Sequence, residues 1–567
     1  MKLPLSLRSS SRTAIAASTL TFFSALPAGA YALPVMPSPE AKVVQGVIVG
    51  DRTMAGTRSL EVFRGVPYAA APTGSHRWRE PQPVAPWAGK REAKRFAPRC
   101  MQMEAPGMTF RSQSMSEDCL YLNVWAPAAR ATGGKLPVLV YFHGGGFAVG
   151  DGSEPRYDGS HLAARGMIVV TVNYRLGAFG FMMHPDASRE STTGAVGNYG
   201  LLDQQAALRW VRENIASFGG DAQQVTIGGE TAGAMAVSAH MAAPSSRGLF
   251  ARAIGESGGA FTPNGFWRRD KAERVAQSLA GRLEAPSLEA MRAIPAERVQ
   301  QAMGTYRQPQ PFFWPTIDGR FLTDTPAAIF EAGAQAPVPL LVGSNAQESH
   351  FRNVSGPFEP TPENWAVILE AVFGKDLAEA RPFYPGNDAG QVVRSASTLA
   401  NDLTFSHSTW RWMDLHRRTG RAPVYFYEFA HRRPAVAAPA DDARDAARRS
   451  PDTGAPHRSE IVYVFGNLDQ DRRAQWTNED RAVARIFSGY VAQFVKTGDP
   501  NGTKDTRVYA PMHERAQSER LPQWPAVHEA REGLARQVID TRTRTSHDSS
   551  AARQALVERI LSARRGG

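Results

Sequence analysis

The chain has 567 residues, of which 42% are hydrophobic and 21% charged, a composition that is ordinary for a soluble globular protein. Much of the formal net charge of +11 lies in three segments that look peripheral, namely the N-terminal leader, Arg444–Arg458 and the arginine-rich tail after Arg531. No basic stripe is interleaved with aromatic residues, so the composition argues against a nucleic-acid-binding protein.

The N-terminal segment has the layout of a secretory signal peptide. A basic start with Lys2, Arg8 and Arg12 precedes an apolar stretch that is too short to span a bilayer, and an A-x-A cleavage site follows at 28–30. A buried or membrane-spanning helix is the alternative for this stretch. We expect residues 1–30 to be removed and the protein to be secreted or periplasmic. No later segment is apolar enough for stable membrane insertion.

The chain has two cysteines, Cys100 and Cys119. Export would place them in an oxidising compartment, where a disulfide can persist. Closing so short a loop would stabilise the fold by ~3 kcal/mol in the chain-entropy model. Two buried free thiols are the alternative. No Cys and His residues have the spacing of metal ligands, so we expect neither a metal site nor a cofactor.

The strand pattern changes after residue 124. From about Val43 to Val124, short β-rich runs alternate with turn residues, which is typical of an antiparallel edge of a larger sheet or of a small antiparallel sheet. Continuous apolar runs at Leu136–Tyr141 and Met167–Val172 then predict strands that are buried on both faces of a largely parallel sheet. Apolar residues recur at helical spacing over Leu202–Ser217. The alternation of strand and helix predicts an α/β protein.

A strand, a tight turn and a helix are predicted around Thr231. Val225–Gly228 has a strand pattern, Gly229-Glu230-Thr231-Ala232-Gly233 is the turn, and Ala234–Ala243 has a helical pattern. This is the setting of the G-x-S-x-G nucleophile elbow, with threonine in place of serine. Side chains at the two outer glycines would clash where the strand and the helix pass close together.

A second segment, Gly255-Glu256-Ser257-Gly258-Gly259, fits the G-x-S-x-G expression literally. The residues that follow, Ala260–Gly265, have the composition of a loop and do not begin a helix. Because an elbow requires the helix, the context favours Thr231 over Ser257 as the nucleophile position.

Two later apolar runs, Pro339–Val342 and Val424–Phe429, predict further core strands, with mostly helical chain between them. Residues Pro434–Pro456 are rich in Ala, Pro, Asp and Arg and predict a long surface loop ahead of His457.

Several segments resemble, in the same order, those of the type-B carboxylesterases, the family that includes para-nitrobenzyl esterases and cholinesterases. The resemblance runs from about residue 43 to 526. Its landmarks are Phe63–Ala69, Ser116–Val124, His143–Phe147, Asn173–Arg175, Gly197–Gln204, Phe218–Asp221 and Thr497–Asn501, and Ser153–Gly159 is similar to the bacterial para-nitrobenzyl branch. The resemblance implies an α/β-hydrolase fold, with a large, mostly parallel central sheet flanked by helices and a small N-terminal antiparallel sheet.

The resemblance also implies the domain organisation. A single α/β-hydrolase domain is expected over residues 31–545. Residues 546–567 are left as a C-terminal tail, in which Gln554–Arg564 forms either a short amphipathic helix or a frayed end.

The register of the family implies the catalytic roles. Thr231 falls on the nucleophile, Glu348 on the acid and His457 on the base, and this order along the chain is that of α/β-hydrolases. Ser257 lies 26 residues after Thr231, and a serine at that offset in the family supports the acid through a hydrogen bond.

The same register implies an oxyanion hole. The glycine run at 144–146 exposes backbone N–H groups, and those of Gly145 and Gly146 are expected to join the N–H of Ala232 around the developing oxyanion. His457 would take the proton of the attacking hydroxyl, and Glu348 would fix the imidazole tautomer and stabilise the imidazolium.

Threonine keeps the hydroxyl but adds a methyl group where the substrate carbonyl must approach. A displacement of ~1 Å can cost ~100-fold in rate, and a β-branched residue fits the positive-φ backbone of an elbow poorly. Two classes of function therefore follow. The first is a carboxylesterase that cleaves a small-molecule ester through an acyl-enzyme on Thr231. The second is an impaired or inactive hydrolase-fold protein that binds a ligand or partner. The intact Glu348, His457 and glycine run favour the enzyme; the sequence indicates neither substrate nor oligomeric state.

Overall fold

The computed structural model describes residues 37–105, 108–129, 134–191, 193–261, 265–305, 308–309, 311–434, 454–472, 474–502, 521–529 and 533–563. The expected signal peptide at 1–30 and most of the predicted loop Pro434–Pro456 lie outside the described residues. By its contacts the chain divides after Pro37, and the residues from Ser38 onward form one compact unit.

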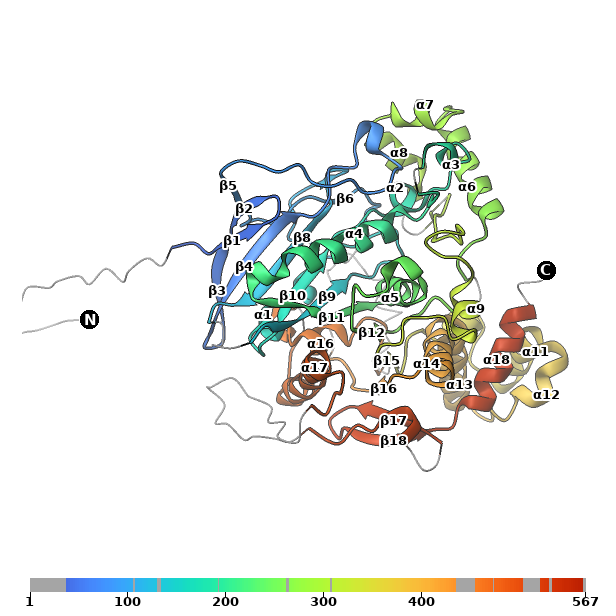
Figure 1. The fold of residues 1–567 in the computed structure, drawn as a ribbon. Coiled ribbons are helices and arrows are strands. Elements are labelled where there is room, and N and C mark those ends of the chain that lie inside the picture. Colours follow the sequence, from blue (N-terminus) through green and yellow to red (C-terminus); the bar gives the residue numbers. More distant parts are fainter. Residues whose placement is uncertain are drawn as a thin grey trace, which may run out of the picture. The chain divides into compact units, whose positions relative to one another are not determined.

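An eleven-stranded sheet runs through the described part of the chain (Figure 1). Its central strands are parallel and lie in the order β10 (Ile168–Val172), β9 (Leu136–Phe142), β11 (Gly220–Glu230), β12 (Arg252–Glu256), β15 (Leu340–Asn345), β16 (Val424–Phe429) and β17 (Leu534–Ile539). Antiparallel strands complete both edges, with β8 (Tyr121–Pro127), β4 (Arg58–Pro67) and β3 (Asp51–Ala55) at one and β18 (Arg544–Asp548) at the other. The predicted α/β class and mostly parallel sheet are confirmed.

The small N-terminal sheet is mixed, whereas a wholly antiparallel sheet was expected. Strands β1 (Glu40–Val43) and β2 (Gly46–Val49) pair antiparallel, but β5 (Lys90–Glu92) pairs with β2 in parallel. The difference arises because β5 does not follow β2 through a hairpin. The chain first builds β3 and β4 in the large sheet and then returns.

Both faces of the large sheet are covered. Along β9, Val138 and Val140 belong to one core and Leu139 and Tyr141 to another, because successive side chains of a strand point to opposite faces. The first core includes residues of α4 (Tyr199–Asn214) and α5 (Ala232–Ala242), and the second includes residues of α1 (Ser160–Ala163), α16 (Ile461–Phe465) and α17 (Asn478–Thr497). Burial on both faces explains why these strands appear in the sequence as continuous apolar runs.

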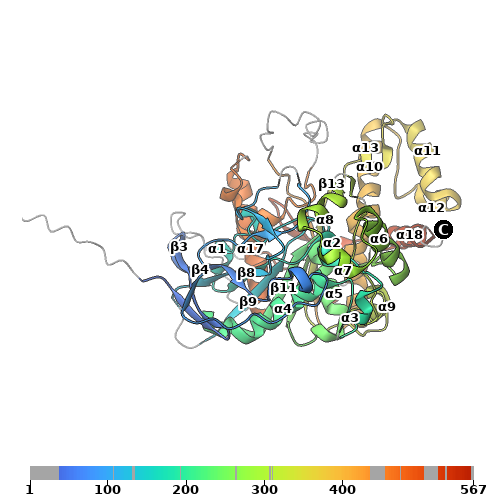
Figure 2. The ribbon, with the colours of Figure 1, turned by 90° about the horizontal axis from the view of Figure 1, so that it is seen from above.

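Helices between β15 and β16 form a separate group with its own core. They are α10 (Arg352–Ser355), α11 (Pro362–Phe373), α12 (Leu377–Ala380) and α13 (Ala389–Asn401). The next helix, α14 (His407–Thr419), instead buries Trp412, Met413 and Leu415 in the first core. Both views place α18 (Ala551–Ala563) beside the separate group (Figures 1 and 2). Trp365, Leu369, Leu399 and Leu556 share this core, so the mostly helical stretch predicted here is confirmed.

Of the short helix and the frayed end expected over Gln554–Arg564, the described residues form a helix. Strand β18 runs through residue 546 to Asp548, and α18 follows it. The boundary drawn at 545 in the sequence therefore falls inside a strand. Leu556 and Ile560 are buried in the core of the helical group, and this burial holds α18 against the rest of the protein.

Cys100 and Cys119 form a disulfide, with their Cα atoms 4.9 Å apart, so the alternative of two free thiols is excluded. Of the helices that the structure describes, none combines the length and the apolar character needed to cross a membrane.

Candidate active site

Thr231 occupies the turn between β11 and α5. Its backbone has φ 50° and ψ −113°, a conformation that a β-branched residue rarely adopts. The glycines at both ends of the turn, Gly229 and Gly233, allow the strand and the helix to pass close together. A Cβ atom on Gly229 would lie 2.5 Å from the carbonyl carbon of Gly233, and one on Gly233 would overlap the carbonyl oxygen of Phe142. The clash predicted at these two positions is therefore confirmed.

The structure brings together Thr231, Glu348 and His457. His457 Nδ1 lies 2.7 Å from Glu348 Oε2, and its Nε2 lies 3.1 Å from Thr231 Oγ1. This is the connectivity that a hydroxyl, a base and an orienting carboxylate require.

Backbone contacts place the histidine beside the carboxylate. Glu348 follows β15 closely, and its Oε1 accepts a hydrogen bond from the N–H of Asn345 at 2.6 Å. Gln347 forms an isolated parallel bridge with Pro456, and Asn345 Nδ2 donates to the Pro456 carbonyl at 2.8 Å. These contacts tie the residue before His457 to the loop that carries Glu348.

The imidazole ring of His457 is covered on one face by Phe405. The ring centroids are 4.1 Å apart and the planes differ by 16°. Phe405 belongs to η6 (Asp402–Ser406), a π-helical turn between α13 and α14. The sequence analysis did not identify this residue, because no sequence signal in that stretch distinguishes a π-helical turn from the helices on either side.

The glycine run after β9 packs directly against the elbow. Gly145 and Gly146 have φ 115° and 63°, a region that only glycine enters readily. The N–H groups of these two residues donate to no acceptor in the described part of the chain, and Ala232 begins α5, where N–H groups have no partner within the helix. All three donors expected around an oxyanion are therefore available.

The methyl group of Thr231 faces this loop. A Cβ atom on Gly144 would lie 2.6 Å from Thr231 Cγ2, so the methyl group occupies space that glycine at 144 leaves open. The hydroxyl is thereby turned toward His457. The loop itself is held by Tyr174, whose hydroxyl donates to the His143 carbonyl at 2.6 Å and whose ring stacks on that of His143.

Ser257 is fully buried, with φ 51°. The family resemblance implies that it supports Glu348. Its hydroxyl donates to Glu460 Oε1 at 3.3 Å. Burial raises the pKa of both Glu348 and Glu460, and hydrogen bonding by Ser257 opposes that rise at each carboxylate. Ser257 thus lies between two carboxylates, of which the sequence analysis identified one.

Glu230 and Glu460 are the functional candidates that the sequence analysis missed. Both are fully buried, and Glu230 Oε1 lies 3.2 Å from His457 Nε2. Asn345 Nδ2 donates to Glu460 Oε2. Their positions held a usable signal, since Glu230 is adjacent to Thr231 and Glu460 lies three residues after His457, directly before α16.

Burial sets the protonation states of the site. It lowers the pKa of His457 to about 4, so the ring is neutral near pH 7 and can accept a proton. Burial raises the pKa of Glu230 to about 7, against the opposing charges of His457 and Arg458. Burial also raises the pKa of Glu348, which hydrogen bonds from Ser257 and from the Asn345 N–H oppose.

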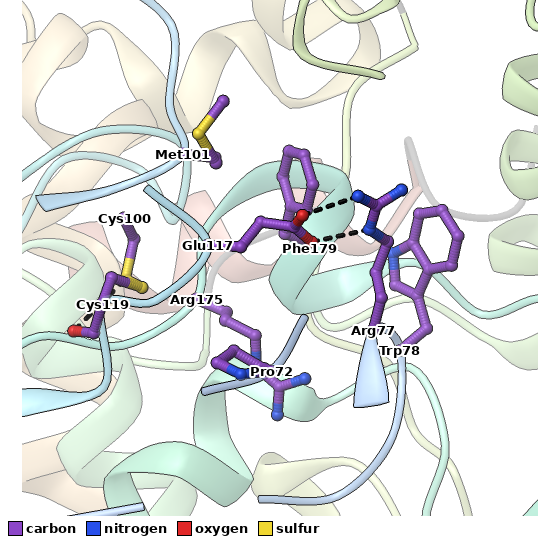
Figure 3. Close-up of a pocket in the computed structure, with 9 residues that line it drawn as sticks. All are labelled: Pro72, Arg77, Trp78, Cys100, Met101, Glu117, Cys119, Arg175 and Phe179. Carbon is purple, nitrogen blue, oxygen red and sulfur yellow. Dashed lines mark hydrogen bonds and ion pairs between the residues drawn. A yellow bond between two sulfur atoms is a disulfide. The ribbon is translucent and has the colours of Figure 1, made fainter. Parts of the chain in front are cut away.

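A small cavity beside the disulfide is distinct from this site. It is lined by Pro72, Arg77, Trp78, Cys100, Met101, Glu117, Cys119, Arg175 and Phe179 (Figure 3). Its charges are paired internally, since Arg77 donates to both oxygens of Glu117 at 2.6 Å. No group of His, Cys, Asp or Glu side chains among the described residues is arranged to hold a metal ion.

The sequence matches a family model described as the carboxylesterase family over residues 37–555. It is 36% identical over 469 residues to a fumonisin B1 esterase of Sphingopyxis macrogoltabida, covering 80% of this chain and 82% of that protein. It is 35% identical to carboxylesterase 4A of Bos taurus, covering 86% of this chain and 89% of that protein. With the para-nitrobenzyl esterase of Bacillus subtilis strain 168 the identity is 34%, over 87% of this chain and 94% of that protein.

Proposed function

Since this chain belongs to the carboxylesterase family of carboxylic-ester hydrolases, we propose that it cleaves esters through an acyl-enzyme formed on Thr231. His457 is the general base and acid, Glu348 orients it, and the N–H groups of Gly145, Gly146 and Ala232 form the oxyanion hole. The observation that carries the proposal is the position of the His457 imidazole, with Nδ1 at 2.7 Å from Glu348 Oε2 and Nε2 at 3.1 Å from Thr231 Oγ1.

Acylation begins when Thr231 Oγ1 attacks the ester carbonyl carbon and its proton passes to His457 Nε2. The carbonyl oxygen becomes an oxyanion, which the three N–H groups stabilise. When this intermediate collapses, the bond to the leaving oxygen breaks, and His457 gives its proton to that oxygen to release the alcohol. Glu348 stabilises the imidazolium that exists between the two proton transfers.

Deacylation repeats these steps with water as the nucleophile. His457 takes a proton from the water as its oxygen attacks the acyl carbon. Collapse of the second intermediate breaks the bond to Thr231 Oγ1, returns the proton to that oxygen and releases the carboxylic acid. The neutral state of His457 that both attacks require is favoured near pH 7, because burial lowers its pKa to about 4.

The methyl group of Thr231 slows this chemistry and does not prevent it. It packs toward Gly144, on the side of the oxyanion loop, while Oγ1 keeps its contact with His457. The proton path is therefore intact. The cost falls on the approach of the substrate carbonyl to the oxyanion hole, where a displacement of about 1 Å reduces the rate by roughly 100-fold.

The test compares wild type, Thr231→Ser and Thr231→Ala on 4-nitrophenyl acetate and butyrate. We expect Thr231→Ser to raise kcat/KM by about tenfold or more, because it removes the methyl group. Thr231→Ala should lower kcat/KM by at least about 1,000-fold, because it removes the nucleophile. Trapping with a fluorophosphonate, followed by peptide mass spectrometry, should place the adduct on Thr231.

Two results would contradict the proposal. If wild type and Thr231→Ala are equally inert while Thr231→Ser is active, the natural chain is not an esterase and a ligand-binding role replaces it. If Thr231→Ala keeps full activity, or the adduct maps to Ser257, the nucleophile is misassigned.

We further propose that the protein is exported. The proposal rests on the signal-peptide pattern of residues 1–30. The Cys100–Cys119 disulfide supports it, because structural disulfides are rare in reducing compartments.

A further inference from the structure

The π-helical turn η6 (Asp402–Ser406) lies against the base of the proposed site and against the loop that carries its acid. The ring of Phe405, within this turn, stacks on the His457 imidazole, with the two centroids 4.1 Å apart. Both ring nitrogens of His457 keep their partners beneath this cover. Phe405 therefore opposes any tilting of the imidazole toward its own side.

The residue before the turn, Asn401, holds the loop that carries Glu348. Its Oδ1 accepts a hydrogen bond from the N–H of Ser349 at 2.8 Å, and its Nδ2 donates to the Ala346 carbonyl at 2.8 Å. Thr404, within the turn, adds a hydrogen bond of 2.8 Å between its hydroxyl and that of Ser349. The backbone is thus held on both sides of Glu348, and one short segment positions the acid as well as the base.

Gln554, on α18, binds both ends of this turn. Its Nε2 donates to Oδ1 of Asp402, the first residue of the turn, at 2.9 Å. Its Oε1 accepts from Nδ1 of His407, the residue directly after the turn, at 2.8 Å, because an amide oxygen can only accept. All three side chains are buried. A single amide of the C-terminal helix therefore spans the turn and fixes the separation of its ends.

Other side chains keep the two partners of Gln554 in place. Asp402 Oδ2 accepts from the Tyr384 hydroxyl at 2.8 Å and lies 3.1 Å from Arg553 Nε. His407 Nε2 lies 2.6 Å from Glu558 Oε2. A π-helical turn is a rare departure from the α-helix and is frequent at functional sites. Contacts from outside the turn are therefore expected to hold it in this form.

The alternative is that Gln554 only attaches α18 to the protein. The helix has other attachments that do not involve the turn, since Leu556 and Ile560 are buried in the core of the helical group and Arg559 pairs with Glu379. A buried amide costs free energy unless it is hydrogen-bonded, so apolar side chains would attach the helix more simply. The place of this amide, at both ends of the turn, indicates a role in the turn.

We propose that Gln554 is a positioning residue for ester hydrolysis: by fixing both ends of the π-helical turn, it keeps the His457 imidazole and the Glu348 carboxylate in line. The C-terminal helix then helps to align the site, although none of its residues touches the reacting atoms. This inference rests on the proposed function and leaves the covalent steps unchanged.

The test compares wild type with Gln554→Met, which keeps an unbranched side chain of similar length and loses both hydrogen bonds. We expect kcat for 4-nitrophenyl acetate to fall by about tenfold with a smaller change in KM, because a small displacement of the base lowers the rate. The matched control is Arg559→Gln, which removes the ion pair of α18 with Glu379 and leaves the turn untouched. Its kcat should equal that of wild type.

The pH profile of kcat/KM separates positioning from a general loss of stability. Burial lowers the pKa of His457 to about 4. A displaced Phe405 would expose the ring to water and move this pKa toward the ordinary ~6.5. Because the neutral ring is the active form, Gln554→Met should lose more activity at pH 5 than at pH 8. The charged groups that face the ring are the same in the variant, namely Glu348, Glu230, Arg458 and Arg156.

A double variant tests whether Gln554 acts through the turn. Phe405→Leu removes the stacked ring and should by itself move the lower inflection of the profile upward. Adding Gln554→Met should move that inflection no further, because both changes remove the same contact. A further shift in the double variant would overturn the proposal.

Two other results would also overturn it. The first is a Gln554→Met variant with the kcat and the pH profile of wild type. The second is an Arg559→Gln variant that loses as much as Gln554→Met, since α18 would then contribute stability alone.

Failure of the hydrolase proposal is read separately. If wild type is inert, the same variants are compared in the Thr231→Ser background. If that protein is inert too, the measurement is the rate at which diethyl pyrocarbonate modifies His457, followed by peptide mass spectrometry with the exposed His76 as reference. Gln554→Met should raise this rate, because the ring loses its cover, and an unchanged rate overturns the positioning role without any reference to catalysis.

Discussion

Two turns of this protein have nearly the same backbone and opposite environments. The first, Gly229–Gly233, follows β11, and the second, Gly255–Gly259, follows β12. The two strands pair in register, with Gly229 opposite Gly255. Thr231 has φ 50° and Ser257 has φ 51°. Thr231 is half-buried and meets His457 Nε2, whereas Ser257 is fully buried between Glu348 and Glu460.

The continuation of the chain accounts for this difference. After Thr231 the chain enters α5, so Thr231 lies between the last residue of β11 and the first residue of α5. After Ser257 no helix begins at once, and Gly258 packs so close to Thr231 that a Cβ atom there would lie 2.6 Å from the Thr231 carbonyl oxygen. The second turn therefore supports the first from the protein interior. A literal G-x-S-x-G match identifies the turn geometry, and exposure decides which turn can meet a substrate.

The largest effect on stability is expected at the glycines of the first turn. Gly233→Ala forces a Cβ atom against the Phe142 carbonyl oxygen, part of a backbone that cannot rotate away. We expect a loss of about 3 kcal/mol in the free energy of unfolding, measured by urea denaturation. Gly259→Ala is the control in the second turn, where the nearest atoms would lie at 3.2 Å, and it should cost less. Equal losses would mean that the two turns are equally constrained.

A smaller effect is expected when the second turn loses its hydroxyl. Ser257→Ala removes a hydrogen bond to the Glu348 and Glu460 carboxylates, so kcat should fall by about 10- to 100-fold with little change in KM. The control is Ser395→Ala, which removes a hydroxyl that donates to the Pro385 carbonyl in the separate helical group. It should leave kcat unchanged. A loss of kcat as large as that expected for Thr231→Ala would instead identify Ser257 as the nucleophile.

The smallest effect concerns the pH profile of kcat/KM. Because burial lowers the pKa of His457 to about 4, the ring stays neutral down to that pH, and activity should fall only as the pH drops through about 4. Burial raises the pKa of Glu230 to about 7, so this carboxyl becomes charged as the pH rises through 7. Its charge stabilises the imidazolium that forms during catalysis, and a second, smaller rise in activity should appear there.

Glu230→Gln tests the step near pH 7. It should make that step smaller and keep the one near pH 4, since glutamine does not titrate. Burial raises the pKa of Glu348 and of Glu460 to about 7 as well, so these two carboxyls keep part of the step. A single inflection near 6.5, the ordinary imidazole value, would show that the half-buried Thr231 turn is more hydrated than its contacts indicate.

The sequence predicted the sheet well because its signal is local. The runs at Leu136–Tyr141, Met167–Val172 and Val424–Phe429 are continuous and apolar, as burial on both faces requires, and strands occupy all three places. The sequence said less where contacts depend on distant chain. The parallel contact of β5 with β2 and the docking of α18 follow from the order in which the chain returns, which no local pattern encodes.

In the candidate site, too, the sequence predicted some residues and not others. The resemblance to the family identified Thr231, Glu348, His457 and Ser257, because each lies in a segment that is similar to a family segment. Glu230 and Glu460 lie in the same segments and were overlooked: their closeness to Thr231 and His457 along the chain was a signal, but their burial beside the base is visible only in the structure. Phe405 lies in a segment without any motif, and only the π-helical turn brings its ring onto the imidazole of His457.

By itself the sequence determined the family, the α/β class and the threonine in the elbow, because these depend on residue identity and on spacing along the chain. The tertiary structure alone decided where the Thr231 methyl group lies, that Ser257 meets Glu460 and which charges surround the base. These depend on atoms that are far apart in the chain and close in space, and the burial that shifts the pKa values of His457 and Glu230 arises only when the sheet and its helices have closed over them.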